Sequence, residues 1–303
     1  MSTIILQIFN GFSVGSILLL IGLGLSITFG LMKIINMAHG ELIMIGAYST
    51  YMVQILFKNL AGGKFFSLYF ILALPISFLI AMAFGILIEG IVIKHLYGRP
   101  ADSLLATWGI SIILQQLARS IFGAPNVDVQ SPQWLKGNIK LGGIAFPYSR
   151  LFIIFIAGIC IVCVYLYLYK TRTGRNIRAV MQNRNMASCL GIPTRKIDAY
   201  TFALGSGLAG IAGCALTLIG PIGPSIGTGY IVDAFMVVVL GGVGRLVGAV
   251  AGGLVMGMFS TWSEFLIGTS LGRGVVFLLI IIFLQWKSKG MFPISTRALD
   301  EEV

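Results

Sequence analysis

"KTRTGRNIRAVMQNRNMASCLGIPTRKI", residues 170–197, interrupts a chain that is otherwise mostly apolar. The segment carries seven basic side chains and no acidic one: Lys170, Arg172, Arg175, Arg178, Arg184, Arg195 and Lys196. The chain of 303 residues is 57% hydrophobic and only 10% charged, whereas soluble domains carry about 25% charged residues. So little charge does not cover a water-exposed surface. The sequence therefore predicts an all-α polytopic membrane protein in which segment 170–197 lies outside the bilayer.

Apolar runs recur along the whole chain, which predicts a single transmembrane domain over residues 1–303. A helix that crosses a bilayer needs about 20 apolar residues. Nine transmembrane or re-entrant helices are expected, at 8–31, 36–57, 67–93, 103–121, 150–169, 198–219, 230–243, 246–266 and 271–286. The seventh is short for a crossing, so it is expected to be a half-helix or a re-entrant segment.

The basic segments determine the expected orientation, because cytoplasmic loops are enriched in Lys and Arg. Segment 170–197 is predicted to be cytoplasmic, together with 94–102 and a tail that carries Lys287, Lys289 and Arg297. Segment 122–149 then forms an extracytoplasmic loop, the N-terminus faces outward, and the chain lies in a bacterial plasma (inner) membrane. The net charge of +11 is explained by topology. No nucleic-acid partner is predicted, since no binding module or aromatic-and-basic face occurs.

Many of the 39 glycines lie four residues apart, as in Gly11 and Gly15 or Gly248 and Gly252. Small residues at this spacing let the backbones of membrane helices approach closely. Residues 11–48 and 205–243 both run as a glycine-rich span, a short polar break and a second glycine-rich span. By the orientation above, the two copies begin on opposite sides, which predicts an inverted repeat typical of transporters.

Within 170–197, a helix is predicted over residues 175–190. Gly191 and Pro193 end it, since Gly followed by Pro is a helix stop signal. Its apolar face is expected to hold Ile177, Val180, Met181 and Leu190. Two interpretations remain open: the helix lies on the membrane surface, or it docks into a groove of a partner protein.

A second unusual stretch, "INMAHGELIMIGAY" at residues 35–48, places Asn36, His39 and Glu41 inside an apolar region. An ionisable group at membrane depth costs at least about 2.5 kcal/mol, so these side chains are expected at an interface, in pairs or at a cavity. Either Asn36 caps the following helix with Glu41 in its first turns, or the three side chains line a transport pathway. A structural or gating role for His39 and Glu41 is favoured over direct substrate contact.

A polar stripe in the fourth span repeats every four residues as Thr107, Ser111 and Gln115, with Trp108 beside it. Residues four apart drift only about 40° around a helix, so the stripe forms one sloping face. It is expected either to line the pathway, with Trp108 as a flat wall, or to hydrogen-bond to a neighbouring helix.

Three acids lie in or beside the other apolar runs. Asp233 is a further pathway candidate, because it lies near the start of the short seventh span. Asp233, Glu89 and Glu264 are each able to pair with an arginine. Arg245 and Arg273 are the candidate partners, and the sequence does not assign the pairs.

The motif "AVMQNRNMASCLGI" (179–192) has a spacing formed by Ala179, Asn183, Ala187, Gly191 and Ile192. This spacing resembles the cytoplasmic coupling segment of permease subunits of branched-chain amino acid-type ABC importers. The stretch at 35–48 is similar to the signature after the first span of that family, and "FMVVVLGGVGRLVGAVAGG" (235–253) to its glycine-rich C-terminal signature.

Residues 98–127 and 220–239 look most like the urea-type permease, the first of its two membrane subunits. Arg245 departs from the family pattern, which has a smaller or uncharged polar residue there. The pair Pro221 and Pro224 is a second departure.

The resemblance implies a permease subunit that forms half of the substrate pathway of an ATP-driven importer. Its implied partners are a homologous second permease subunit, two ATP-binding subunits, an extracytoplasmic substrate-binding protein and membrane lipids. The chain has no GxxxxGK(S/T) phosphate loop, so partner chains would hydrolyse ATP, and the chain is predicted to be non-catalytic and without a cofactor. Arg175, Arg178 and Arg184 then contact acidic surfaces of the ATPase, or they only set the topology.

Urea is the substrate expected from this resemblance, because a neutral, planar molecule suits a path of uncharged polar groups and flat apolar walls. Branched-chain amino acids and short-chain amides are the alternatives, and an ATP-independent channel is a different class. An enzyme is not expected, since His39 and His95 are the only histidines and no paired acid–base or metal-binding set occurs.

Overall fold

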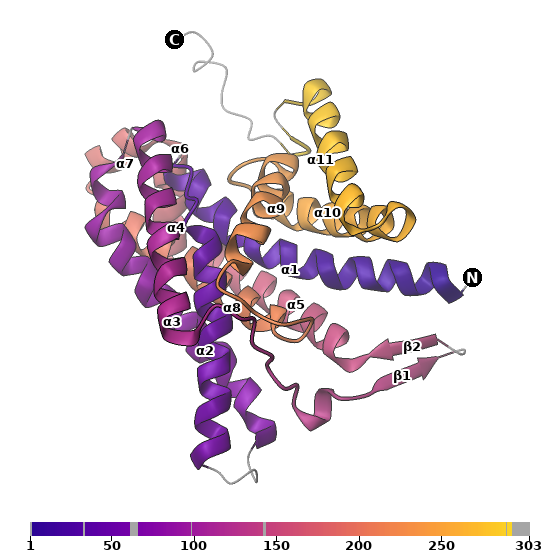
Figure 1. Cartoon of the computed structure of the whole chain (residues 1–303). Helices are drawn as coiled ribbons and strands as arrows, with labels where there is room; N and C mark the ends of the chain where they lie inside the picture. Colours follow the sequence, from indigo (N-terminus) through magenta and orange to yellow (C-terminus); the bar gives the residue numbers. More distant parts are fainter. Residues whose placement is uncertain are drawn as a thin grey trace.

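The computed structural model describes residues 2–32, 34–60, 66–97, 99–141, 144–288 and 290–292, and it confirms an all-α polytopic membrane protein (Figure 1). Lys289 and Arg297 of the predicted cytoplasmic tail lie outside these residues. The helices are α1 (Ser2–Met32), α2 (His39–Leu60), α3 (Tyr69–Ile91), α4 (Pro100–Phe122), α5 (Tyr148–Lys170), α6 (Arg172–Gln182), α7 (Arg184–Cys189), α8 (Thr194–Leu216), α9 (Ile226–Gly241), α10 (Leu246–Ile267) and α11 (Thr269–Trp286). Three 3-10 turns, η1 (Phe66–Leu68), η2 (Ile93–His95) and η3 (Gln133–Leu135), complete the helical elements.

Each of the nine predicted spans coincides with a helix. Among the described residues, eight helices are long and apolar enough to cross a bilayer, and α9 is a shorter apolar helix of 16 residues. The helix α9 begins four residues before the predicted seventh span and is continuous. The segment predicted as a loop at 122–149 contains a hairpin of β1 (Asn138–Leu141) and β2 (Ile144–Pro147), which lies far from α6 and α7 in Figure 1.

The helices pack in matched pairs, as an inverted repeat requires. The packing of α1 on α10 matches that of α8 on α3, and the packing of α1 on α9 matches that of α8 on α2. The packing of α2 on α3 likewise matches that of α9 on α10. The helices α1 to α4 therefore correspond to α8 to α11. The C-terminal part of α1 and the N-terminal part of α8 both lie near α6, so corresponding helices run in opposite directions.

Glycine brings the backbones of these helices into direct contact. A Cβ atom on Gly46 of α2 would overlap the backbone of Gly210 of α8, and one on Gly257 of α10 would overlap Gly15 of α1. A Cβ on Gly248 would overlap the backbone of Gly241. The predicted packing role of the four-residue glycine spacing is thus confirmed.

The first repeat is broken between α1 and α2, and α2 begins inside the bundle. The Nε2 atom of His39 lies 3.4 Å from the carbonyl oxygen of Ile21, and α1 continues for 11 residues beyond Ile21 to Met32. Eleven helical residues span about 16 Å, so the end of α1 lies about that far beyond the level of His39. Residues 34–38 therefore lead the chain back into the bundle. The first turn of α9 lies against the same place, because a Cβ on Gly40 would come within 2.5 Å of the carbonyl oxygen of Gly227.

The glycine contacts predict a large cost for a bulky side chain. We expect Gly46→Val to destabilise the detergent-solubilised chain by about 1–3 kcal/mol or more, because overpacking forces the helices apart. The measurement is the melting temperature by intrinsic fluorescence. Gly158→Val is the matched control, since a Cβ on Gly158 of α5 meets nothing within 4 Å. Equal melting temperatures for the two variants would contradict this account of the packing.

Candidate functional site

The predicted coupling segment forms two helices rather than one. The side chain of Thr171 caps α6 by accepting a hydrogen bond from the Gly174 N–H at 3.0 Å. Asn183 is extended, with φ −153° and ψ 105°, and its Oδ1 atom accepts from the Met186 N–H at 3.0 Å. The prediction of a continuous helix over 175–190 is wrong, because Asn183 leaves the first helix and caps the second. Gly191, at φ +80°, follows the second helix as predicted.

The apolar face of this segment divides between the two helices. Ile177 and Val180 are buried, and they attach α6 to the bundle. Leu190 is 74% exposed and Met186 is 60% exposed, so the prediction that Leu190 shares the apolar face of Ile177 is wrong. The break at Asn183 redirects α7 so that the side chains of Met186 and Leu190 point away from the bundle, while Ala187 faces it.

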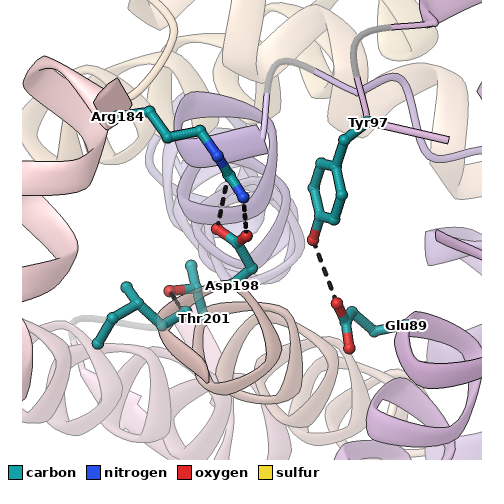
Figure 2. A network of polar contacts seen from close by, with 6 residues as sticks. Glu89, Tyr97, Arg184, Asp198 and Thr201 are labelled. Carbon is teal, nitrogen blue, oxygen red and sulfur yellow. Dashed lines mark hydrogen bonds and ion pairs between the residues drawn. The ribbon is translucent and has the colours of Figure 1, made fainter. Parts of the chain in front are cut away.

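A charged contact fixes α7 to the bundle (Figure 2). The Arg184 guanidinium donates to both carboxylate oxygens of Asp198, at 3.0 Å and 2.5 Å. Asp198 is fully buried in the first turns of α8. A buried carboxylate is strongly unfavourable without a partner, so Asp198 requires Arg184 at this position.

Tyr97 extends this contact to α3. The guanidinium of Arg184 lies over the Tyr97 ring, 4.9 Å from its centroid, and the Tyr97 hydroxyl donates to Glu89 at 3.2 Å. Burial, and next the nearby carboxylates of Asp198 and Glu89, raise the pKa of Tyr97, so the hydroxyl keeps its proton and remains a donor. The four residues join α7, α8, the turn after η2 and the end of α3 (Figure 2).

Other predicted coupling residues lie in different environments. Arg175 is exposed, Ala187 is buried, and Ala179 is half-buried. The guanidinium of Arg178 lies over the Tyr169 ring at 4.5 Å, and that of Arg184 is bound by Asp198. Arg175 is therefore the one of the three candidate arginines whose side chain has no ion pair or ring contact among the described residues.

Asp198 and Tyr97 were missed as site residues. A single acid placed directly after the basic run at 170–197 was the available signal for Asp198. Glu89 was singled out, but with an arginine as its partner rather than a tyrosine. Glu264 lies 3.6 Å from Arg273, one of the two candidate arginines.

The two polar groups predicted in the second and fourth spans form one cluster. Glu41 is fully buried, and its Oε1 atom accepts from the Ser111 hydroxyl at 2.8 Å and from the Gln115 amide at 2.9 Å. The Thr107 hydroxyl accepts from the Met37 N–H at 3.1 Å. The interhelical hydrogen bonds expected for the stripe are therefore present, and they attach α4 to the start of α2.

Trp108 does not belong to this cluster. Its side chain is 54% exposed, and most of the other large apolar side chains of α4 are exposed as well. The predicted flat wall at Trp108 thus faces away from the buried stripe, because Thr107 and Ser111 occupy the inner face of the helix. Asp233 is buried in α9, and the hydrogen bonds among the described residues that build the cluster do not include it.

Asn36 and His39 keep unused hydrogen-bonding groups inside the bundle. Asn36 is 2% exposed and His39 is fully buried. Both amide atoms of Asn36 and the Nδ1 atom of His39 lack a hydrogen-bond partner among the described residues. A buried unsatisfied group costs about 1–3 kcal/mol. Asn36 lies in the break that precedes α2, and His39 is the first residue of α2, near the point where the first turns of α2 and α9 meet.

A bundle of apolar helices built from two inverted repeats is the architecture of a membrane permease. The family described as branched-chain amino acid transport system / permease component matches residues 7–284, and the chain belongs to this family. It is a non-catalytic permease component of a transport system.

Several known permeases are similar to the chain. The high-affinity branched-chain amino acid transport system permease protein BraD of Pseudomonas aeruginosa is 31% identical over 292 residues, which cover 94% of each chain. The corresponding protein LivH of Escherichia coli is 31% identical and covers 92% of each chain. The ribose import permease protein RbsC of Escherichia coli is 32% identical over 149 residues, 47% of this chain and 46% of its own. No solved structure matches the chain.

The contact between Arg184 and Asp198 gives a measurable prediction. We expect Asp198→Asn and Arg184→Met to lower the melting temperature of the solubilised chain each, and the double variant to recover part of the loss. The expected coupling energy is about 2 kcal/mol, because each single change leaves a charged group without its partner. Arg175→Met is the control for loss of an exposed arginine. Additive effects of the two changes would contradict the pairing.

Proposed function

We propose that the chain is the permease subunit of an ATP-driven importer for branched-chain amino acids in a bacterial inner membrane. The observation that carries the proposal is the construction of α7. Met186 of this helix and Leu190, the residue directly after it, are exposed, while the ion pair of Arg184 with Asp198 binds the helix to α8. An exposed apolar surface on a firmly attached helix suits the groove of a separate motor protein.

The proposed orientation places α6 and α7 in the cytoplasm, because segment 170–197 carries the largest group of basic residues. Two ATP-binding subunits then meet α7 and its counterpart in a homologous second permease subunit. An extracytoplasmic binding protein delivers the substrate to the opposite end, which includes the β1–β2 hairpin. The segment thus serves as a docking element rather than only a surface anchor.

Movement of α7 is transmitted through the residues of Figure 2. Arg184 moves Asp198 and therefore α8, while the ring and hydroxyl of Tyr97 connect the same guanidinium to Glu89 of α3. The helices α3 and α8 pack closely on each other, and α8 meets α2 at Gly210 and Gly46. A push on α7 consequently alters the place where the first turns of α2 and α9 meet.

The contact between the first turns of α2 and α9 is the proposed gate. Asn36 and His39 provide unused polar groups there, and Glu41 is held by Ser111 and Gln115. The N-terminal ends of two helices favour a negative group, and half-helix N-termini commonly face anionic substrate groups in transporters. These helix ends are compatible with the carboxylate of an amino acid substrate.

The relatives also favour amino acids. BraD and LivH are named as branched-chain amino acid permeases and cover more than nine-tenths of the chain. They give no support to the urea specificity expected from residues 98–127 and 220–239. Branched-chain amino acids, the alternative named beside urea, are accordingly the substrate that we propose.

Uptake in a strain that lacks this gene tests the substrate. We expect uptake of labelled leucine at low concentration to fall and to return when the gene is supplied, while urea uptake stays unchanged. Leucine is the choice because the substrate proposed has a carboxylate and a branched apolar side chain. Loss of urea uptake with normal leucine uptake would contradict the proposal.

The exposed surface of α7 tests the coupling. We expect Leu190→Asp to lower substrate-stimulated ATPase activity of the assembled, reconstituted transporter about tenfold or more. Burying a leucine at a partner contributes about 1.5–3 kcal/mol, and 1.4 kcal/mol corresponds to about a tenfold change. Asn185→Asp places the same charge on an exposed neighbouring residue and serves as the control. Normal stimulation in Leu190→Asp would exclude α7 as the docking element.

A further inference from the structure

A cavity lies beside α6, away from the residues of Figure 2. Its volume is about 350 Å³, and it is enclosed by α1, α5, α6 and the turn that leads into α10. The residues that line it include Ser26, Tyr169, Arg178, Met181, Arg245 and Val247. None of these residues takes part in the contact between Arg184 and Asp198.

The cavity is positively charged. Its lining includes Arg178 and Arg245 but no acidic residue, and neither arginine belongs to the ion pairs found among the described residues. The Tyr169 ring holds the Arg178 guanidinium at the cavity, 4.5 Å from the ring centroid. Two arginines without carboxylates in a shared cavity call for an anionic ligand.

The helix α10 adds to this field. Arg245 is its N-cap residue, and Leu246 and Val247 of its first turn also line the cavity. The first N–H groups of a helix have no partner within the helix, and the dipole favours an anion at this end. Gly244, at φ +77°, forms the turn that places Arg245 there.

The apolar part of the lining indicates where the ligand comes from. Val247 is 60% exposed and Tyr169 is 44% exposed, and both belong to helices that cross the bilayer. A ligand held between them has its anionic group at the arginines and an apolar part along α5 and α10. A phospholipid has this form, whereas an acidic peptide of a soluble partner lacks the apolar part.

We propose that this cavity binds the headgroup of an anionic phospholipid, with the phosphate between Arg178 and Arg245. The site gives Arg245, which has no ion pair among the described residues, a charged partner. Basic cavities between membrane helices are suited to such headgroups. The site is independent of the substrate, because its lining includes none of the pathway candidates.

Native mass spectrometry of the full chain tests this site. The chain is extracted from nanodiscs of equal parts phosphatidylglycerol and phosphatidylcholine, and the lipids retained per chain are counted. We expect preferential retention of phosphatidylglycerol, reduced about fivefold by Arg245→Gln and again by Arg178→Gln, since each arginine contributes about 1 kcal/mol to binding an anionic lipid. Arg245→Lys should keep most of the retention, which separates loss of charge from loss of folding.

Arg175→Gln is the matched control, because Arg175 is an exposed arginine of α6, the helix of Arg178, and does not line the cavity. Unchanged retention in both Arg245→Gln and Arg178→Gln would overturn the site. Equal retention of phosphatidylcholine would also overturn it. Release of phosphatidylglycerol by millimolar inorganic phosphate would identify a site for free anions instead, and would equally overturn the lipid proposal.

Discussion

The ion pair between Arg184 and Asp198 is the contact on which the proposed coupling depends. Asp198 is fully buried at the start of α8, and a carboxylate in that position is tolerated only with a close, hydrogen-bonded cation. The partner comes from α7, a helix of six residues that has little apolar area of its own against the bundle. The electrostatic requirement of one buried acid thus fixes the position of the exposed helix.

Glycine contacts determine what happens to a displacement of α8. Lipid surrounds the helices with apolar groups, so burial of apolar side chains gives little driving force between them, and close backbone packing takes its place. Helix α8 meets α1 at Gly24 and Gly205, α2 at Gly46 and Gly210, and α3 at Gly210 and Ser77. Such contacts do not deform gradually, so a shift of α8 is passed on to its neighbours. The buried polar groups of Asn36 and His39 lie at the start of α2, where these shifts converge.

Much of the fold was predictable, because its signals are local in sequence. Apolar runs defined the spans, and glycine spacing defined the packing. The shared order of span, polar break and span in segments 11–48 and 205–243 indicated the inverted repeat. The stop at Gly191 followed from backbone geometry. The break at Asn183 was missed because an asparagine in a helical pattern is usually tolerated, and only the cap on Met186 shows that it ends the helix.

Contacts between distant residues were less accessible. The stripe at Thr107, Ser111 and Gln115 was found, but its attachment to Glu41 depends on how α4 lies against α2. Trp108 adjoins the stripe in sequence yet faces outward, because only a narrow inner face of α4 is buried. The partner of Arg184 was not predicted, since the basic run made each arginine look available to another protein.

Distances between spin labels show whether α7 and α8 move as one body when the ATP-binding subunits act. In a chain whose four cysteines are replaced, labels are introduced by Met186→Cys in α7 together with Tyr200→Cys in α8 or Leu271→Cys in α11, all exposed positions. The assembled transporter is compared without nucleotide and with ATP bound. We expect an unchanged distance from α7 to α8 and a changed distance from α7 to α11. A changed distance from α7 to α8 with a constant distance to α11 would rule out coupling through Arg184 and Asp198.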